Sequence, residues 1–155
     1  MRGDRVPAFT GAQALGCAPV YNAFHSDTPD RVLPVKPDTI ARSIAIGNPS
    51  DGVYVNRIAR ETGGVVEAVT EEEIVDSMRL LARTEGIFTE TAGGVTIGVL
   101  AKLARAGRWQ GDEVVVAYVT GHGLKTADVL TSANGHARRV EIEPTMKSFR
   151  EKVSL

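Results

Sequence analysis

The stretch that most constrains how this chain can fold is residues 114–125, which read VVVAYVTGHGLK. It begins as a short apolar run rich in β-branched residues and ends abruptly in Thr-Gly-His-Gly. Such a run is typical of a strand buried on both faces of a parallel sheet. Two glycines around one residue let the backbone turn sharply and approach a bound group closely. Ligands of open α/β sheets lie beyond the carboxyl ends of strands, so Thr120 either faces a ligand or simply begins a tight turn.

Strand-like and helix-like segments alternate along the chain. Strands are predicted over residues 5–12, 43–46, 65–69 and 114–119. Helices are predicted over residues 18–24, 49–62 and 70–85, and from residue 89 or 91 to residue 106. Strand–helix alternation with short connections predicts an α/β fold, in which a mostly parallel sheet carries helices on both faces.

The helix over residues 70–85 has the strongest signals. Thr70 and Glu73 have the spacing of a capping box, in which each side chain satisfies a backbone donor at the helix start. Apolar residues then recur at helical spacing, and Gly86 is placed to end the helix. In the following helix, Gly94 and Gly98 stand four residues apart, which favours close packing against a neighbouring helix.

Composition excludes several classes of protein. The chain has 155 residues, 43% hydrophobic and 24% charged, which is ordinary for a globular domain. A formal net charge of −1 argues against nucleic-acid binding. No apolar run approaches the ~20 residues that cross a bilayer, and no signal-peptide-like stretch is visible, so a cytoplasmic protein is expected. Cys17 is the single cysteine, so neither an internal disulfide nor a cysteine-based zinc site is expected, and no metal site is predicted.

Four blocks of sequence together resemble the threonine synthase family. They are GAQALGCAPV, TIARSIAIGNPSDG, EGIFTETAGGVTIGVLAKLARAG and VVVAYVTGHGLK, at residues 11–20, 39–52, 85–107 and 114–125. In order and spacing the resemblance covers about residues 5–130. Threonine synthases are pyridoxal-phosphate enzymes of the tryptophan-synthase-β-like fold, called fold type II. The resemblance therefore implies the C-terminal part of such an enzyme's large domain over residues 1–132, and a tail over residues 133–155 with a strand and a short helix.

The resemblance also implies that part of the catalytic machinery lies outside this chain. In the family, the lysine that forms the Schiff base with the cofactor lies in an earlier Ser-Phe-Lys-Asp motif, which this sequence does not contain. We therefore expect no catalytic residue here, and we expect a fragment that is inactive alone. Its expected partners are the missing N-terminal half, or further copies of itself joined through exposed strand edges.

The same resemblance suggests binding residues. It places Thr120 beside the pyridine nitrogen of pyridoxal phosphate, with Gly121 where the backbone passes the ring. It places Gly47 and Asn48 in a loop on the substrate side, although Asn48 also suits a purely structural role as a helix cap. His122, between two glycines, is expected to point to solvent or bond a neighbouring loop rather than act as a base.

The expected activity is the conversion of O-phospho-L-homoserine and water to L-threonine and phosphate. Two alternatives remain open from the sequence. One is a non-enzymatic module that binds a small molecule or pairs with another chain. The other is a different pyridoxal-phosphate lyase, such as a threonine dehydratase, acting on another amino acid.

Overall fold

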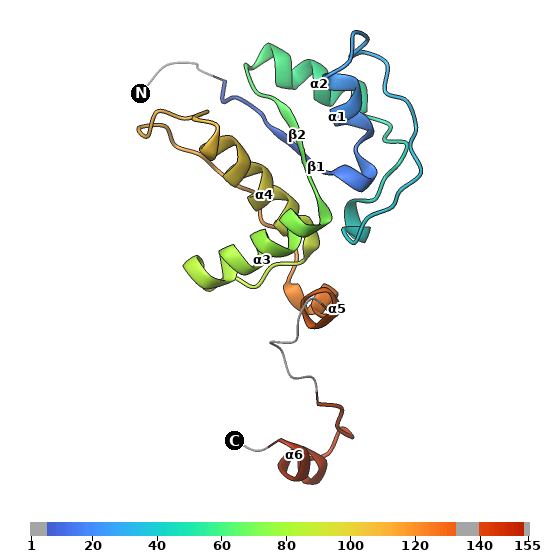
Figure 1. Ribbon diagram of the computed structural model, residues 1–155, viewed down its shortest axis with the longest axis vertical. Coiled ribbons are helices and arrows are strands. Elements are labelled where there is room, and N and C mark those ends of the chain that lie inside the picture. The colour runs from blue at the N-terminus through green and yellow to red at the C-terminus, as the bar shows by residue number, and fades with distance from the viewer. Residues whose placement is uncertain (1–5, 133–139, 154–155) are drawn as a thin grey trace. The chain divides into compact units, whose positions relative to one another are not determined.

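The computed structural model describes residues 6–132 and 140–153 (Figure 1). The chain forms two compact units, Met1–Lys125 and Thr126–Leu155, and each is described by itself. The first unit contains strands β1 (Gly11–Ala14) and β2 (Val66–Val69) and helices α1 (Pro19–Phe24), α2 (Gly52–Glu61), α3 (Glu71–Glu85) and α4 (Thr91–Arg105). The predicted domain boundary after residue 132 adjoins residues outside the described part and stays a prediction.

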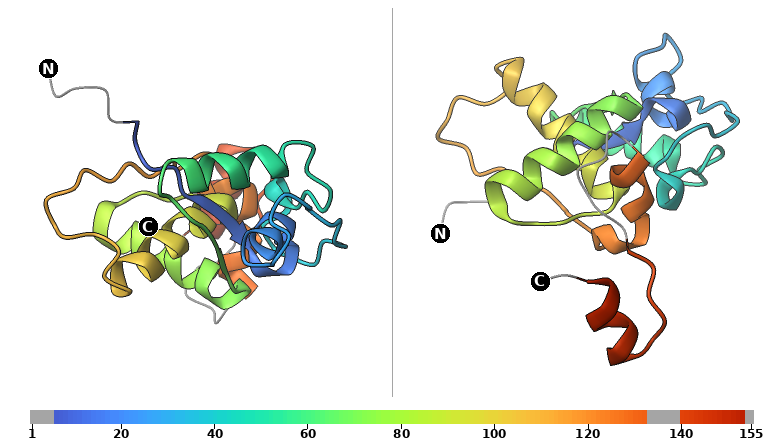
Figure 2. Two further views of the ribbon diagram at one scale, coloured as in Figure 1. Left: turned by 90° about the horizontal axis from the view of Figure 1, so that it is seen from above. Right: turned by 60° about the horizontal axis from the view of Figure 1, so that its bottom comes forward.

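The sheet of the first unit is parallel and has helices on both faces, as predicted. β1 and β2 pair in parallel, with Gly11 opposite Val66. Val66 packs with Val20 of α1 and Ala59 of α2 on one face of the sheet. The next residue, Glu67, points to the other face, where it meets α4. Figures 1 and 2 show α1 and α2 on one side of the strands and α3 and α4 on the other. The α/β class is therefore confirmed.

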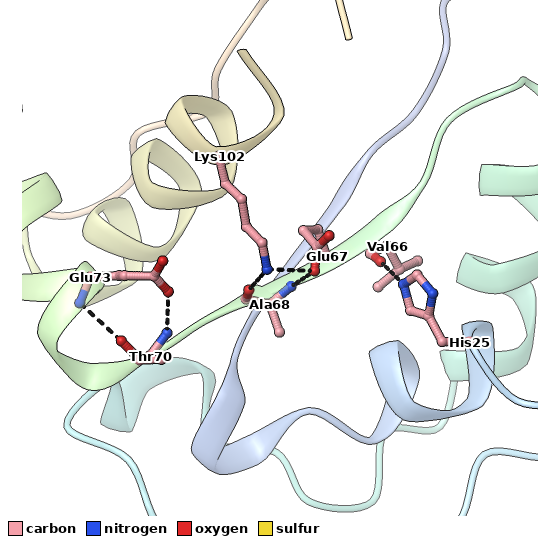
Figure 3. A network of polar contacts seen from close by, with 7 residues as sticks. All are labelled: His25, Val66, Glu67, Ala68, Thr70, Glu73 and Lys102. Atoms are coloured by element: carbon pink, nitrogen blue, oxygen red, sulfur yellow. Dashed lines mark hydrogen bonds and ion pairs between the residues drawn. The ribbon is translucent and has the colours of Figure 1, made fainter. Parts of the chain in front are cut away.

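Helix α3 begins and ends where the sequence indicates. The Thr70 hydroxyl accepts a hydrogen bond from the Glu73 backbone at 3.2 Å, and the Glu73 carboxylate accepts one from the Thr70 backbone at 2.8 Å (Figure 3). Gly86 follows the helix with φ +68°, a left-handed conformation that favours glycine. Ile74 and Met78 are fully buried. The capping box, the apolar stripe and the glycine stop are all confirmed.

Helix α4 packs on α3 through its glycines. A Cβ at Gly94 would lie 2.7 Å from Met78 Cγ and 2.8 Å from the Ile74 carbonyl oxygen. A Cβ at Gly98 would lie 3.0 Å from Ser77 Oγ. These distances are too short for an ordinary side chain, so the two glycines permit the close approach that their spacing indicates.

The start of α4 differs from the prediction, because neither threonine near it acts as a cap. The N-cap residue is Glu90, whose side chain makes no capping hydrogen bond. The Thr89 hydroxyl bonds the Glu90 carbonyl oxygen at 3.2 Å, and the Thr91 hydroxyl bonds the Ile40 carbonyl oxygen at 3.4 Å. In these two bonds, both hydroxyls meet carbonyl oxygens.

The predicted strand over residues 114–119 is wrong in the described structure, where this segment is unpaired. Its side chains are largely exposed, with Val114 at 91% and Tyr118 at 77%. Apolar, β-branched composition favours a strand, but a strand also needs a neighbour for its backbone hydrogen bonds. Within residues 6–132 and 140–153, only β1 and β2 form such a ladder.

Two other strand predictions also change. Instead of a strand at 43–46, a 3-10 helix occupies Arg42–Ile44, because the backbone bonds locally, from Ile44 N to Ala41 O and from Ala45 N to Arg42 O. The first strand begins at Gly11, later than predicted, because β2 offers it only four partner residues.

Helix α2 starts later than predicted. It begins at Gly52 with Asp51 as its N-cap, so Asn48 does not cap it. The predicted stop is confirmed, since Gly63 follows the helix with φ +73°.

The second unit contains α5 (Ala127–Ser132) and α6 (Met146–Lys152). The Thr145 hydroxyl caps α6 by accepting a hydrogen bond from Ser148 N at 3.2 Å. This helix confirms the short one expected in the tail. The strand expected near residues 138–142 falls partly outside the described residues, and residues 140–142 are not in a strand.

Candidate functional site

The Thr-Gly-His-Gly turn lies against the residues that lead into α4. Glu90 N donates to Gly121 O at 3.3 Å, and Gly123 N donates to Phe88 O at 3.0 Å. Between these bonds, Thr89 and His122 form an antiparallel bridge. The turn is therefore held by short β-like pairing with residues 88–90, although the segment before it is unpaired.

Glu90 is the central side chain of this contact. Its side chain is only 5% exposed, and its Oε2 lies 3.0 Å from Lys125 Nζ. Its other oxygen, Oε1, occupies the space that a Cβ on residue 121 would need. Gly121 also has φ +80°, so this position requires glycine for both its conformation and its surroundings. The group that approaches Gly121 closely in this structure is Glu90, and the predicted passage of the backbone past a cofactor ring stays a prediction.

Thr120 immediately precedes this fixed turn and is exposed. Its hydroxyl has no hydrogen-bond partner among the residues that the structure describes. A threonine hydroxyl can donate one hydrogen bond and accept others. Thr120 is therefore available to a ligand, and its predicted role as a cofactor contact stays a prediction.

His122 contributes to the shape of the turn. Its Nδ1 accepts a hydrogen bond from Leu124 N at 3.2 Å. Its ring meets Phe88 edge-on, with the ring centroids 5.6 Å apart. Gly123 allows this contact, because a Cβ at that position would overlap the Phe88 ring. The histidine thus bonds within its own turn.

The second predicted binding segment, Gly47 and Asn48, packs on the proline-rich loop, which is residues 26–38 with Pro29, Pro34 and Pro37. Gly47 O accepts a hydrogen bond from Val35 N at 2.9 Å, and a Cβ at Gly47 would overlap the Val35 carbonyl oxygen. Asn48 is exposed. In the described part of the chain, no hydrogen bond joins this turn with Thr120 or Gly121, so the grouping of the two segments in one site stays a prediction.

A polar cluster not anticipated from the sequence lies at the carboxyl ends of the strands. Glu71, two residues after β2, accepts a hydrogen bond from Ile40 N at 2.8 Å through Oε2. Its Oε1 is buried beside Gly16, which follows β1, and has no hydrogen-bond partner among the described residues. Thr91 bonds the carbonyl of the same Ile40, so α3 and α4 both hold this loop. The one signal in the sequence is an acidic residue that follows shortly after an apolar strand.

Cys17 is buried, and desolvation raises the pKa of its thiol. The thiolate is the reactive form, so this environment disfavours a nucleophilic role. Within the described residues, no group of three or more histidine, cysteine, aspartate and glutamate side chains is placed to hold a metal ion. None of the described helices is long and apolar enough to cross a membrane.

Comparison with known proteins identifies the family. Residues 1–121 match the family model described as pyridoxal-phosphate dependent enzyme. The chain is 42% identical to threonine synthase of Methanocaldococcus jannaschii over 141 residues, covering 90% of this chain and 35% of that protein. It is 41% identical to threonine synthase of Methanosarcina acetivorans over 122 residues, covering 79% of this chain and 30% of that protein.

Among solved structures, the crystal structure of a threonine deaminase from T.th. matches with a TM-score of 0.49 at 15% identity. That match covers 62% of this chain and 34% of the other. The chain spans about a third of the length of the threonine synthases that it matches, in their C-terminal part. Since the family model covers most of its length, the chain belongs to the family of pyridoxal-phosphate dependent enzymes.

Proposed function

We propose that this chain is the C-terminal part of a threonine synthase, which converts O-phospho-L-homoserine and water to L-threonine and phosphate. The observation that carries the proposal is the identity of 42% and 41% to two threonine synthases over most of the chain. The activity belongs to the assembled enzyme, because this chain accounts for only about a third of those relatives.

Thr120 is the residue that we propose to contact pyridoxal phosphate. When bound, this cofactor draws electrons away from the carbon skeleton of an amino acid and so permits elimination and replacement. The hydroxyl of Thr120 is exposed and has no hydrogen-bond partner in the described part of the chain, which fits a hydrogen bond to the ring nitrogen. A hydroxyl can donate to a neutral nitrogen, but it cannot stabilise a positively charged ring as a carboxylate would. Gly121 keeps the adjoining backbone free of a side chain.

Gly47 and Asn48 are proposed to face the substrate. O-phospho-L-homoserine carries a phosphate and a carboxylate, and the amide group of Asn48 can donate hydrogen bonds to either. Asn48 is exposed and does not cap α2, so its side chain is available for this purpose. The turn is supported from behind by the proline-rich loop through the bond from Val35 N to Gly47 O.

Residues 114–119 are proposed to form the contact with the rest of the enzyme or with another copy of this chain. They present Val114, Val116 and Tyr118 to solvent and leave their backbone unpaired with any strand that the structure describes. Exposed apolar strand-like segments favour pairing with another chain. A cytoplasmic location and a lack of contact with nucleic acid stay predictions.

A complementation assay tests the proposed function. Residues 1–155 are mixed with the N-terminal part of the Methanocaldococcus jannaschii threonine synthase, and phosphate and threonine are measured after adding O-phospho-L-homoserine and pyridoxal phosphate. We expect equal amounts of both products from the mixture and neither from the separate parts. Thr120→Ala should lower the rate about tenfold, the value of one hydrogen bond of ~1.4 kcal/mol, and Thr120→Ser should restore it.

The proposal fails if the mixture binds pyridoxal phosphate but releases no phosphate from O-phospho-L-homoserine. Production of 2-oxobutanoate from threonine by the same mixture would instead identify a dehydratase. The exposed Thr28, in the loop after α1, is a matched control, since Thr28→Ala should leave the rate unchanged.

A further inference from the structure

We infer that Glu90 and Lys125 form a positioning pair that holds the Thr120–Gly121 turn in the geometry required to meet the cofactor. This inference rests on the proposed function for the identity of the ligand. The contacts that carry it belong to this chain alone, and they can be tested with no ligand present.

The first contact is the ion pair. Glu90 carries a carboxylate on a side chain that is 5% exposed, and a carboxylate so buried needs a compensating cation. Lys125 provides that cation, with Nζ 3.0 Å from Oε2. Lys125 is only five residues beyond Thr120, so the pair ties the far end of the turn to the start of α4.

The second contact is between the same carboxylate and the turn itself. Oε1 of Glu90 lies where a side chain of residue 121 would be, against a backbone with φ +80°. The backbone of Glu90 also donates to Gly121 O at 3.3 Å. One residue therefore contacts Gly121 through its amide and through one carboxylate oxygen, while its other oxygen binds Lys125.

These contacts make the position of Thr120 depend on Lys125. Without the ammonium group, Glu90 would be a buried carboxylate with no cation, and it would gain stability by turning toward water. That movement vacates the space beside Gly121 and removes the support of the turn. Thr120, attached directly to Gly121, would then shift relative to α4.

A second lysine–glutamate pair provides a matched control. Lys102 Nζ, on α4, lies 3.1 Å from Glu67 Oε1 and also donates a hydrogen bond to Ala68 O at 3.0 Å (Figure 3). Its glutamate is also mostly buried, at 18% exposed. This pair joins α4 to β2, and among the described residues no hydrogen bond or ion pair links it with the turn at residues 120–123. The general effect of losing a lysine–glutamate ion pair, tested at Lys102, can therefore be separated from the specific effect on the turn, tested at Lys125.

The first experiment measures backbone amide chemical shifts in residues 1–155 without ligand. We expect Lys125→Met and Glu90→Gln each to shift the amides of residues 120–123, and Lys125→Arg to restore them. Lys102→Met should shift amides of β2 instead. The double variant Glu90→Gln/Lys125→Met should melt at a higher temperature than Lys125→Met, because it leaves no buried carboxylate uncompensated. Unchanged amides at 120–123 in both single variants would overturn the inference.

The second experiment measures binding of 4′-deoxypyridoxine 5′-phosphate, a ring analogue without the aldehyde, to the complemented enzyme. We expect Lys125→Met to weaken binding about tenfold, and Lys102→Met to leave it unchanged. Equal binding by the wild type and Lys125→Met would overturn the inference. Failure of the wild-type assembly to bind the analogue would count against the proposed function, while the amide shifts would still decide whether the pair positions the turn.

Discussion

Helix α4 separates two regions of opposite character. Before it, α3 packs on α4 with Ile74 and Met78 fully buried. After it, residues 108–120 run without regular secondary structure, and Val114 is 91% exposed. Both regions are rich in apolar residues, so hydrophobicity alone does not explain why one is ordered into a core and the other is not.

The difference lies in whether each segment satisfies its own backbone. A helix bonds its backbone internally, and α3 adds a capping box and a glycine stop that are encoded within its own residues. A strand obtains its hydrogen bonds from a neighbour, and the described residues offer none beside residues 114–119. The turn after that segment is nevertheless fixed, because Glu90 and the backbone before α4 hold it. The geometry of the candidate site thus derives from a helix start.

The comparison predicts the largest loss of stability for a core residue of α3. Ile74→Ala removes a fully buried side chain from the contact with α4, and we expect the free energy of unfolding to fall by ~2–5 kcal/mol. Urea titration followed by circular dichroism measures it. Ile58→Ala on α2, where the side chain is largely exposed, is the matched control and should cost under ~1 kcal/mol. Equal losses of unfolding free energy in the two variants would show that the contact between α3 and α4 is not the main stabilising core.

A smaller loss is expected from the glycines between α3 and α4. Gly94→Ala would place a Cβ within 2.8 Å of the Ile74 carbonyl oxygen, which is backbone and cannot easily move. Overpacking of ~1–3 kcal/mol should outweigh the ~1 kcal/mol that alanine gains in helix propensity. Gly98→Ala meets its nearest atom, Ser77 Oγ, at 3.0 Å and should cost less. The comparison is measured by thermal melting, and the reverse order would contradict this account of the packing.

The capping box of α3 should contribute less again. Thr70→Ala removes the hydroxyl that accepts a hydrogen bond from Glu73 N, with an expected loss of ~1 kcal/mol. Thr84→Ala, at an exposed position near the end of the same helix, removes a hydroxyl that bonds the Leu80 carbonyl of its own helix and should change little. Both are measured by urea titration. A larger loss for Thr84 than for Thr70 would mean that the box does not stabilise this helix.

The sequence predicts this molecule best where the determinants are local. Thr70, Glu73 and Gly86 lie within one helix, and their spacing carries the whole signal. The packing of Gly94 was also predictable, since small residues one turn apart allow two helices to approach. In both cases, the residues that decide the structure are few and close together in the chain.

The features that the sequence did not predict depend on distant residues. The contact of Glu90 with Lys125 spans a separation that no spacing rule covers, and a glutamate before a helix is interpreted as an ordinary favourable charge. Residues 114–119 have the composition of a strand, but composition does not determine whether a neighbouring strand is available to pair with them. Asn48 and Pro49 suggest a helix start, whereas α2 begins at Gly52. These three features depend on tertiary contacts, which local sequence patterns do not reveal.

The smallest effect on stability should come from the exposed segment itself. Val116→Ser changes a side chain that is 70% exposed, so the free energy of unfolding should change by less than ~0.5 kcal/mol. The same change should lower self-association at high concentration, measured by sedimentation velocity, because it removes apolar surface from an unpaired segment. Val95→Ser, in the buried face of α4, is the matched control and should destabilise strongly. A large loss of stability in Val116→Ser would show that residues 114–119 already pack within the folded chain, and the contrast across α4 would then disappear.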